Sequence, residues 1–133
     1  MTGKADRATT AQESASRTSG APFASGAIVL VSLNSPREKF WGMVLDLAPA
    51  GVSLRGIELN CFEDFSRQVK AGDSVTPNAV FFPMHRVERI ELDSHNGEIP
   101  SLQERFASKT GCEFQEILQG SLPSSKSQAE RGP

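Results

Sequence analysis

The chain has 133 residues, a net charge of −2 at pH 7 and only 38% hydrophobic residues. This length allows one ordinary domain, and the charge balance argues against nonspecific nucleic-acid binding, which needs a basic surface. The apolar deficit is local, because residues 1–25 and 119–133 contain almost no large apolar side chains. Such segments bury too little apolar surface to offset the entropy of ordering. We therefore expect one folded domain over 26–118 between two disordered tails.

The N-terminal segment lacks the charged, apolar and small-residue order of a signal peptide. The longest apolar run, Ala27 to Val31, is too short to cross a bilayer. Two cysteines, Cys61 and Cys112, make no disulfide framework. These observations predict a cytoplasmic protein with reduced thiols and no membrane contact.

The first three expected strands are consecutive. Residues 27–34 form an apolar run rich in β-branched residues, and Ser35-Pro36 interrupts it. Residues 40–48 and 52–59 then form a hairpin around Pro49-Ala50-Gly51, a tight turn in which the glycine tolerates positive φ.

Two glycines inside these strands predict irregularities. Gly42 suits the sharp bend that a small barrel needs to close. After Gly56 the apolar residues change parity, which favours a β-bulge at that glycine. Trp41 shares the period-two face of Met43 and Leu45, so we expect it in the core.

An inserted helix precedes the last two strands. Asn60 is a good N-cap residue and Glu63 completes a capping-box pattern, so a helix is expected over 60–72. Strands are expected over 79–84 and 87–93, with the corner between them at His85-Arg86.

A second helix is expected over 101–111. Ser101 and Glu104 form a capping box, and Gly111 suits the C-terminal end. The sequence therefore predicts a mainly β domain of five short, mostly antiparallel strands, with an inserted helix and a C-terminal helix.

These features resemble the Sm-like or SH3-like small β-barrel. The resemblance covers about 27–93 and rests on Gly42, the hairpin at 40–59 and the VFFPMHRVERIEL ending. It implies a five-stranded barrel. Sm-like proteins are RNA-binding rings, so it also implies an RNA-binding oligomer as one candidate function. The RNA-contacting motifs of that family are not matched, and His85-Arg86 is only weakly similar to them.

A second resemblance concerns residues 46–51, DLAPAG, which are similar to the D-x-S-x-x-G element of PilZ domains, the cyclic di-GMP-binding family. Ala48 replaces the serine of this element, and Arg7 and Arg17 do not form the R-x-x-x-R that these domains place upstream. A degenerate PilZ-type nucleotide sensor is therefore a third candidate. The run from PREKFWG to FFPMHRVER also resembles a set of small uncharacterised bacterial proteins, and that similarity implies no known activity.

Catalytic and metal-binding patterns are weak. The histidines and cysteines lack the paired spacing of zinc sites: Cys61, His85, His95 and Cys112. Ser66 could combine with His85 and Asp64, but no G-x-S-x-G element frames it. We therefore expect neither catalysis nor a cofactor.

A partner-binding site is expected at two loops. Met84, His85 and Arg86 place an apolar platform beside a cation at the corner, a mixture enriched at protein interfaces. Arg37 and Lys39 add cations at the first turn, and we expect His85 and Arg86 to be exposed. The sequence thus predicts a non-catalytic binding or adaptor module with a protein partner favoured and RNA as the alternative. It leaves the oligomeric state open.

Overall fold

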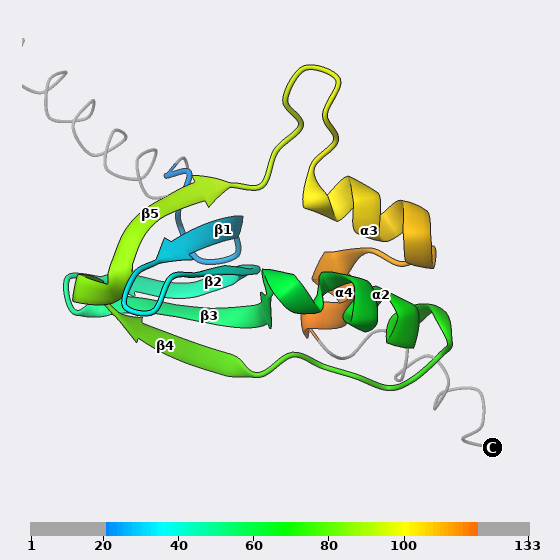
Figure 1. Cartoon of the computed structure of the whole chain (residues 1–133), viewed down its shortest axis with the longest axis horizontal. Coiled ribbons are helices and arrows are strands. Elements are labelled where there is room, and N and C mark those ends of the chain that lie inside the picture. Colours follow the sequence, from blue (N-terminus) through cyan, green and yellow to red (C-terminus); the bar gives the residue numbers. More distant parts are fainter. Residues whose placement is uncertain (1–20, 120–133) are drawn as a thin grey trace, which may run out of the picture.

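The computed structural model describes residues 21–119. Most of the two tails expected at 1–25 and 119–133, namely 1–20 and 120–133, therefore lies outside the described residues. Five strands form one antiparallel sheet in the order β4-β3-β2-β1-β5 (Figure 1). They are β1 (Ile28–Leu33), β2 (Glu38–Ala48), β3 (Gly51–Glu58), β4 (Ala79–Pro83) and β5 (Val87–Leu92). The prediction of a mainly β, five-stranded antiparallel domain is confirmed. Within residues 21–119 no ladder joins β4 to β5, so the sheet is open and the predicted barrel closure is not seen.

A single turn connects the two edge strands. The 3-10 helix η2 (Met84–Arg86) leads directly from β4 into β5, and Figure 1 shows both strands diverging from it. The Met84 N–H donates to the Ala50 carbonyl at 2.9 Å, and the Asn34 N–H donates to the Arg86 carbonyl at 2.8 Å. The turn therefore bonds to both hairpin turns and holds this end of the sheet curled.

The helices gather at the opposite end of the sheet (Figure 1). They are the 3-10 helix η1 (Leu59–Cys61), α2 (Phe62–Lys70), α3 (Leu102–Thr110) and α4 (Phe114–Gln119). The capping box of Ser101 and Glu104 is present at the start of α3, and Gly111 ends it with φ 80°. Both features confirm the sequence prediction.

The predicted start of the inserted helix is wrong. Asn60 lies inside η1, and α2 begins after Cys61 with no side-chain cap. The chain enters α2 through a tighter helical turn, so the Asn60 side chain is not at the capping position.

The sheet has a core on each face. The core on the helix side, here the helix-side core, contains Ile28, Trp41, Phe62, Phe65, Val69, Phe106, Phe114, Ile117 and Leu118. The core on the curled inner side, here the inner core, contains Val29, Val31, Leu33, Val44, Val52 and Leu54. Alternate residues of β1 and β2 enter different cores, so both faces of these strands are buried at the same time.

The two cores explain the change of parity in β3. Val52 and Leu54 enter the inner core, whereas Ile57 packs against the helix-side core. The predicted bulge at Gly56 is wrong, because Gly56 pairs in register with Gly42. The apolar residues change parity because the covered face changes along the strand. A register shift in this hairpin instead falls between Val44 and Asp46.

The N-terminal boundary of the domain lies earlier than the sequence predicts. Phe23 packs against the inner core, although residues 21–25 were expected in the tail. The Ser25 hydroxyl donates to the Leu45 carbonyl at 2.9 Å, and the Gly26 N–H donates to the Val44 carbonyl at 2.8 Å. The Phe23 ring and these two hydrogen bonds together hold the segment against the sheet.

Candidate binding site on the outer face of β1 and β5

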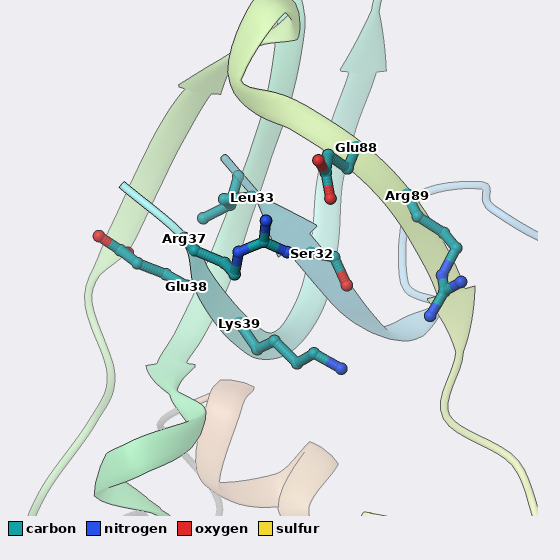
Figure 2. Close-up of a pocket in the computed structure, with 7 residues that line it drawn as sticks. All are labelled: Ser32, Leu33, Arg37, Glu38, Lys39, Glu88 and Arg89. Carbon is teal, nitrogen blue, oxygen red and sulfur yellow. The ribbon is translucent and has the colours of Figure 1, made fainter. Parts of the chain in front are cut away.

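A polar pocket of about 570 Å³ lies where β1, β2 and β5 meet near the first turn (Figure 2). Its lining residues come from all three strands and the turn: Ser32, Leu33, Arg37, Glu38, Lys39, Glu88 and Arg89. Ser32 alternates with Val31 and Leu33 of the inner core, so its side chain faces outward. The helices leave this part of the outer face uncovered.

Strand pairing places two cations beside Ser32. Its partners in the register are Lys39 on β2 and Arg89 on β5. Figure 2 shows the Arg37 guanidinium between Glu88 on one side and Lys39 on the other. Three cationic side chains from separate segments therefore lie around one serine, and the carboxylates of Glu38 and Glu88 line the same pocket.

A β-bulge adds a residue to this site. The register shifts between Ser32, which pairs with Arg89, and Leu33, which pairs with Val87. Glu88 is the extra residue, and both Glu88 and Arg89 line the pocket. Bulges commonly redirect side chains in this way next to functional sites.

The pocket contains groups with unused bonding capacity. The Ser32 hydroxyl oxygen is buried and has no hydrogen-bond partner among the described residues. No carboxylate of residues 21–119 lies within ion-pair distance of Arg37 or Lys39, whereas Arg89 contacts Glu91 at 3.3 Å. An unpaired buried hydroxyl costs about 1–3 kcal/mol.

The predicted corner lies against the predicted turn. Arg86 Nε donates to the Asn34 carbonyl and its Nη2 donates to the Pro36 carbonyl, each at 2.9 Å. Arg86 also lies 3.7 Å from the Glu38 carboxylate, and its side chain is only 20% exposed. The expected exposure of Arg86 is therefore wrong, because its guanidinium braces the first turn.

The five residues predicted to bind a partner thus divide into two groups. Arg37 and Lys39 line the pocket. Met84 is half-buried in η2, and His85 is exposed beside it. The structure adds Ser32, Glu88 and Arg89 to the pocket. Alternation along the strands could have signalled Arg89, but the bulge that places Glu88 there leaves no clear pattern in the sequence.

A second hollow of about 680 Å³ lies between the sheet and the start of α3. Its apolar lining comes from the sheet, η1, the loop before α3 and the first residue of α3: Leu30, Leu59, Leu92, Ile99, Pro100 and Leu102. Leu30 precedes Ser32 by two residues on β1, and Glu91 follows Arg89 by two residues on β5. Side chains two residues apart share a face of a strand, but the two hollows have no lining residue in common.

Asp93 joins the sheet to the helices beside this second hollow. Its carboxylate accepts the Leu102 N–H at 2.8 Å, the Gln103 N–H at 2.9 Å and the Trp41 indole N–H at 3.1 Å. Trp41 is fully buried and stacks on Phe114 at 3.5 Å between ring centroids. One carboxylate therefore accepts hydrogen bonds from the first N–H groups of α3 and from the indole N–H in the centre of the helix-side core.

His95 fastens the loop between β5 and α3. Its Nε2 lies 2.7 Å from the Gly97 carbonyl, and its Nδ1 lies 3.0 Å from Glu104 Oε1. The pKa of His95 is raised, first by the hydrogen bond to Glu104, then by the bond to the Gly97 carbonyl. The pKa of Glu104 is lowered, chiefly by the Ser101 N–H.

Comparisons with known proteins identify no family for this chain. No family model, curated protein or solved structure matches the chain. Among the described residues no cluster of three or more His, Cys, Asp and Glu side chains is arranged to hold a metal ion. None of the helices in residues 21–119 is long and apolar enough to cross a membrane.

Proposed function

We propose that the protein is a non-catalytic binding module whose partner is another protein. The observation that carries this proposal is the polar pocket, where exposed Arg37 and Lys39 lack an ion-pair partner in the described part of the chain. These cations stand beside the unpartnered Ser32 hydroxyl. Exposed charges without an internal partner favour an oppositely charged group supplied by another molecule.

The scaffold supports a binding role. Lys39 and Arg89 stand on strands that flank β1, so their backbone positions are fixed by strand pairing. Arg86 braces the turn that carries Arg37. A preorganised site of this kind loses little conformational entropy when a partner docks.

The proposal is tested by site-specific photo-crosslinking in the native cell. A photoreactive amino acid at position 39 should give discrete protein adducts that survive nuclease treatment. The same amino acid at Gln68, which is exposed on α2, is the matched control and should not give them. Absence of protein adducts at position 39, or their loss after nuclease treatment, would contradict a protein partner.

The alternative function is an RNA-binding oligomer of the Sm-like kind. The observation that favours it is that β4 and β5 are both sheet edges with no ladder partner on one side in residues 21–119. Free edges can pair between copies of a chain. Light scattering separates the candidates, because a ring requires an oligomer. A monomer at all concentrations would exclude this alternative.

The third candidate, a degenerate PilZ-type sensor, predicts binding of cyclic di-GMP. Asp46 is exposed on β2 opposite Ser53, while Arg7 and Arg17 lie outside the described residues. We expect no binding by calorimetry, because Ala48 supplies no hydroxyl and the arginine pair is missing. Binding at micromolar concentration would instead support the sensor.

A further inference from the structure

β4 and β5 are the two edge strands of the sheet, and they differ in charge (Figure 1). β5 carries Glu88, Arg89 and Glu91, whereas residues 74–84, which include all of β4, contain no charged side chain. Charges on an edge strand prevent it from pairing with another strand, and β4 lacks this protection. We propose that β4 pairs antiparallel with β4 of a second copy of the chain, forming a symmetric dimer. This edge shares no residue with the pocket around Lys39, so the inference goes beyond the proposed function.

The backbone groups of β4 alternate between β3 and the free edge. Just before β4 the Gly56 N–H donates to the Asn78 carbonyl at 3.4 Å, and just after β4 the Met84 N–H donates to the Ala50 carbonyl at 2.9 Å. Between these two bonds the register of β3 and β4 is regular. Hydrogen-bonded positions alternate along an antiparallel ladder, so the even-numbered residues of β4 bond to β3 and the odd-numbered residues face the free edge.

The free edge therefore offers a short row of donors and acceptors. The row contains the N–H and C=O groups of Ala79 and Phe81 and the carbonyl of Pro83, which has no N–H. Within residues 21–119 no other strand pairs with this edge. A strand added here would accept and donate the hydrogen bonds that the sheet leaves open.

A twofold axis at Phe81 overlaps the two β4 strands over their whole length. In this register Phe81 lies opposite its own copy, and Ala79 lies opposite Pro83 of the second copy. Each Phe81 N–H then donates to the other Phe81 carbonyl, and each Ala79 N–H donates to a Pro83 carbonyl. The missing N–H of proline falls at the end of the paired strands, where the unused Ala79 carbonyl is open to water. The two sheets become one continuous sheet.

Phe81 supplies the apolar contact of the proposed dimer. Its side chain is 54% exposed, whereas every other Phe and Trp in residues 21–119 is buried or half-buried. It points to the outer face, because its neighbours Val80 and Phe82 pack against the inner core. Residues directly opposite each other in an antiparallel pair have Cβ atoms about 5 Å apart, so the two rings come into contact. Pairing thus removes from water the aromatic side chain that the described fold leaves exposed.

The distribution of charge favours a second copy of β4 as the occupant of this edge. A twofold axis brings each residue near it close to its own copy, so charges there would repel themselves, and residues 74–84 carry none. The cation on the neighbouring strand, Arg55, lies opposite Ala79, so its two copies stand at opposite ends of the paired strands. Pairing of β4 with β5 of another copy would instead place Phe81 beside carboxylates, which lose hydration next to an apolar ring.

Light scattering over a series of concentrations tests the inference with the full chain. We expect the mass of two chains, with a dissociation constant that is roughly micromolar, because one five-residue strand makes a small interface. Phe81→Lys places two like charges at the axis and should weaken association about tenfold or more, in a chain that stays folded because this side chain is exposed. Ile99→Lys, at a 66% exposed residue of the loop before α3, is the matched control and should change association less than about twofold.

A cysteine at position 81 tests the register. Opposite residues of a hydrogen-bonded pair have Cα atoms about 5.5 Å apart, a separation that a disulfide spans. In a Cys61→Ser background, which removes the exposed native thiol, Phe81→Cys should form a disulfide-linked dimer under mild oxidation. Glu88→Cys in the same background is the control, because Glu88 is exposed on the other edge strand, and it should crosslink much more slowly.

Several outcomes would overturn the inference. A monomer at every concentration would leave the edge to a strand of a different protein, and a species larger than a dimer would indicate pairing of β4 with β5 around a ring. A dimer that is unchanged by Phe81→Lys in a folded variant, or equal crosslinking from positions 81 and 88, would place the contact elsewhere. Photo-crosslinking at position 39 tests a different surface, so the inference and the proposed function can fail independently.

Discussion

Asp93 is the residue that joins the sheet to the helix layer, through contacts to Trp41, Leu102 and Gln103. Asp93→Asn keeps the size of the side chain but replaces one acceptor oxygen by an amide that donates. At least one N–H then faces another donor. We expect a loss of about 2 kcal/mol in the free energy of unfolding, measured by urea denaturation.

The neighbouring Ser94→Ala is the control for Asp93→Asn. Ser94 is exposed and follows Asp93 directly. Its substitution should change the free energy of unfolding by less than about 0.5 kcal/mol. Equal losses for the two variants would show that the Asp93 carboxylate has no special role.

His95 gives the loop before α3 a dependence on pH. Both ring nitrogens face acceptor oxygens, on Gly97 and Glu104, and only the doubly protonated ring donates to both. The pKa of His95 is raised above 6.5, so its contribution is complete below pH 6.5 and is lost as pH rises through the folded value. The pKa of Glu104 is lowered below 4.5, so its contribution is present above pH 4.5 and is lost as pH falls through the folded value.

We therefore expect the contact between His95 and Glu104 to be strongest between pH 4.5 and 6.5. An NMR titration should give a midpoint for the His95 ring above 6.5. Glu104→Gln removes the charged acceptor and should lower this midpoint. A midpoint that is the same in both proteins would contradict the contact.

At the level of elements, the hairpin of β2 and β3 depends on a contact between two glycine backbones. A Cβ at Gly42 would lie 2.5 Å from the Arg55 carbonyl oxygen and 2.8 Å from Gly56 Cα, both closer than real side chains allow. The obstructing atoms are backbone, so the strands must separate. Gly42→Ala should cost about 3 kcal/mol, measured by thermal or urea unfolding.

Gly72→Ala is the matched control for Gly42→Ala. Gly72 follows α2 with φ +92°, and a Cβ there would meet no described atom within 4 Å, so only the backbone conformation opposes alanine. That conformation costs about 1–2 kcal/mol. A smaller loss for Gly42→Ala than for Gly72→Ala would show that the hairpin relaxes easily.

Variants in the turn η2 distinguish a role in stabilising the fold from a role in binding a partner. Arg86→Ala removes two hydrogen bonds to the first turn and should lower the free energy of unfolding by about 2 kcal/mol. Arg86→Lys keeps the charge but cannot form both bonds, so a similar loss is expected. His85→Ala, at an exposed residue, should change stability by less than about 0.5 kcal/mol.

These variants also test the prediction that Met84, His85 and Arg86 bind a partner. If His85→Ala weakens partner capture while stability is unchanged, the corner contributes to docking. If Arg86→Ala leaves stability intact, the bracing role assigned to it is wrong. Unfolding by urea and the yield of protein adducts from the photoreactive amino acid at position 39 are the two measurements.

At the scale of the whole molecule, local signals predicted the elements well and their packing less well. Period-two alternation, the turn signal at Pro49-Ala50-Gly51 and the capping box at Ser101 act over a few residues, and the hairpin and α3 that they predicted are present. The turn itself is shorter than predicted, because Gly51 pairs with Ala48 and begins β3 without a positive φ. The second core was not expected, because sequence alone does not say which face of a strand a distant helix covers. Gly56 therefore suggested a bulge where the strand is regular.

The pocket was predicted only in part for a similar reason. Arg37 and Lys39 are close in sequence and stand out as charges in a turn. Arg89 joins them only through the pairing of β1 with β5, and Glu88 only through the bulge beside Leu33. The site is assembled by the pairing of strands that are far apart in the chain. This pairing cannot be read from a single sequence.

The two cores share β1 and β2, so we expect them to unfold together. Val31→Ala in the inner core should cost about 2 kcal/mol, and Phe106→Ala in the helix-side core about 4 kcal/mol. Both should lower the urea midpoint with an unchanged slope. Hydrogen exchange of α3 amides at denaturant concentrations where β1 amides stay protected would contradict a single cooperative unit.

The position of Trp41 has a practical consequence. The chain contains one tryptophan and no tyrosine, so its near-ultraviolet fluorescence comes almost entirely from this indole. The indole stacks on Phe114 and bonds to Asp93, two contacts made by the segments that follow β5. Its emission is therefore a built-in spectroscopic signal for docking of α3 and α4 onto the sheet. A purified sample needs no added dye to show whether these helices are in place.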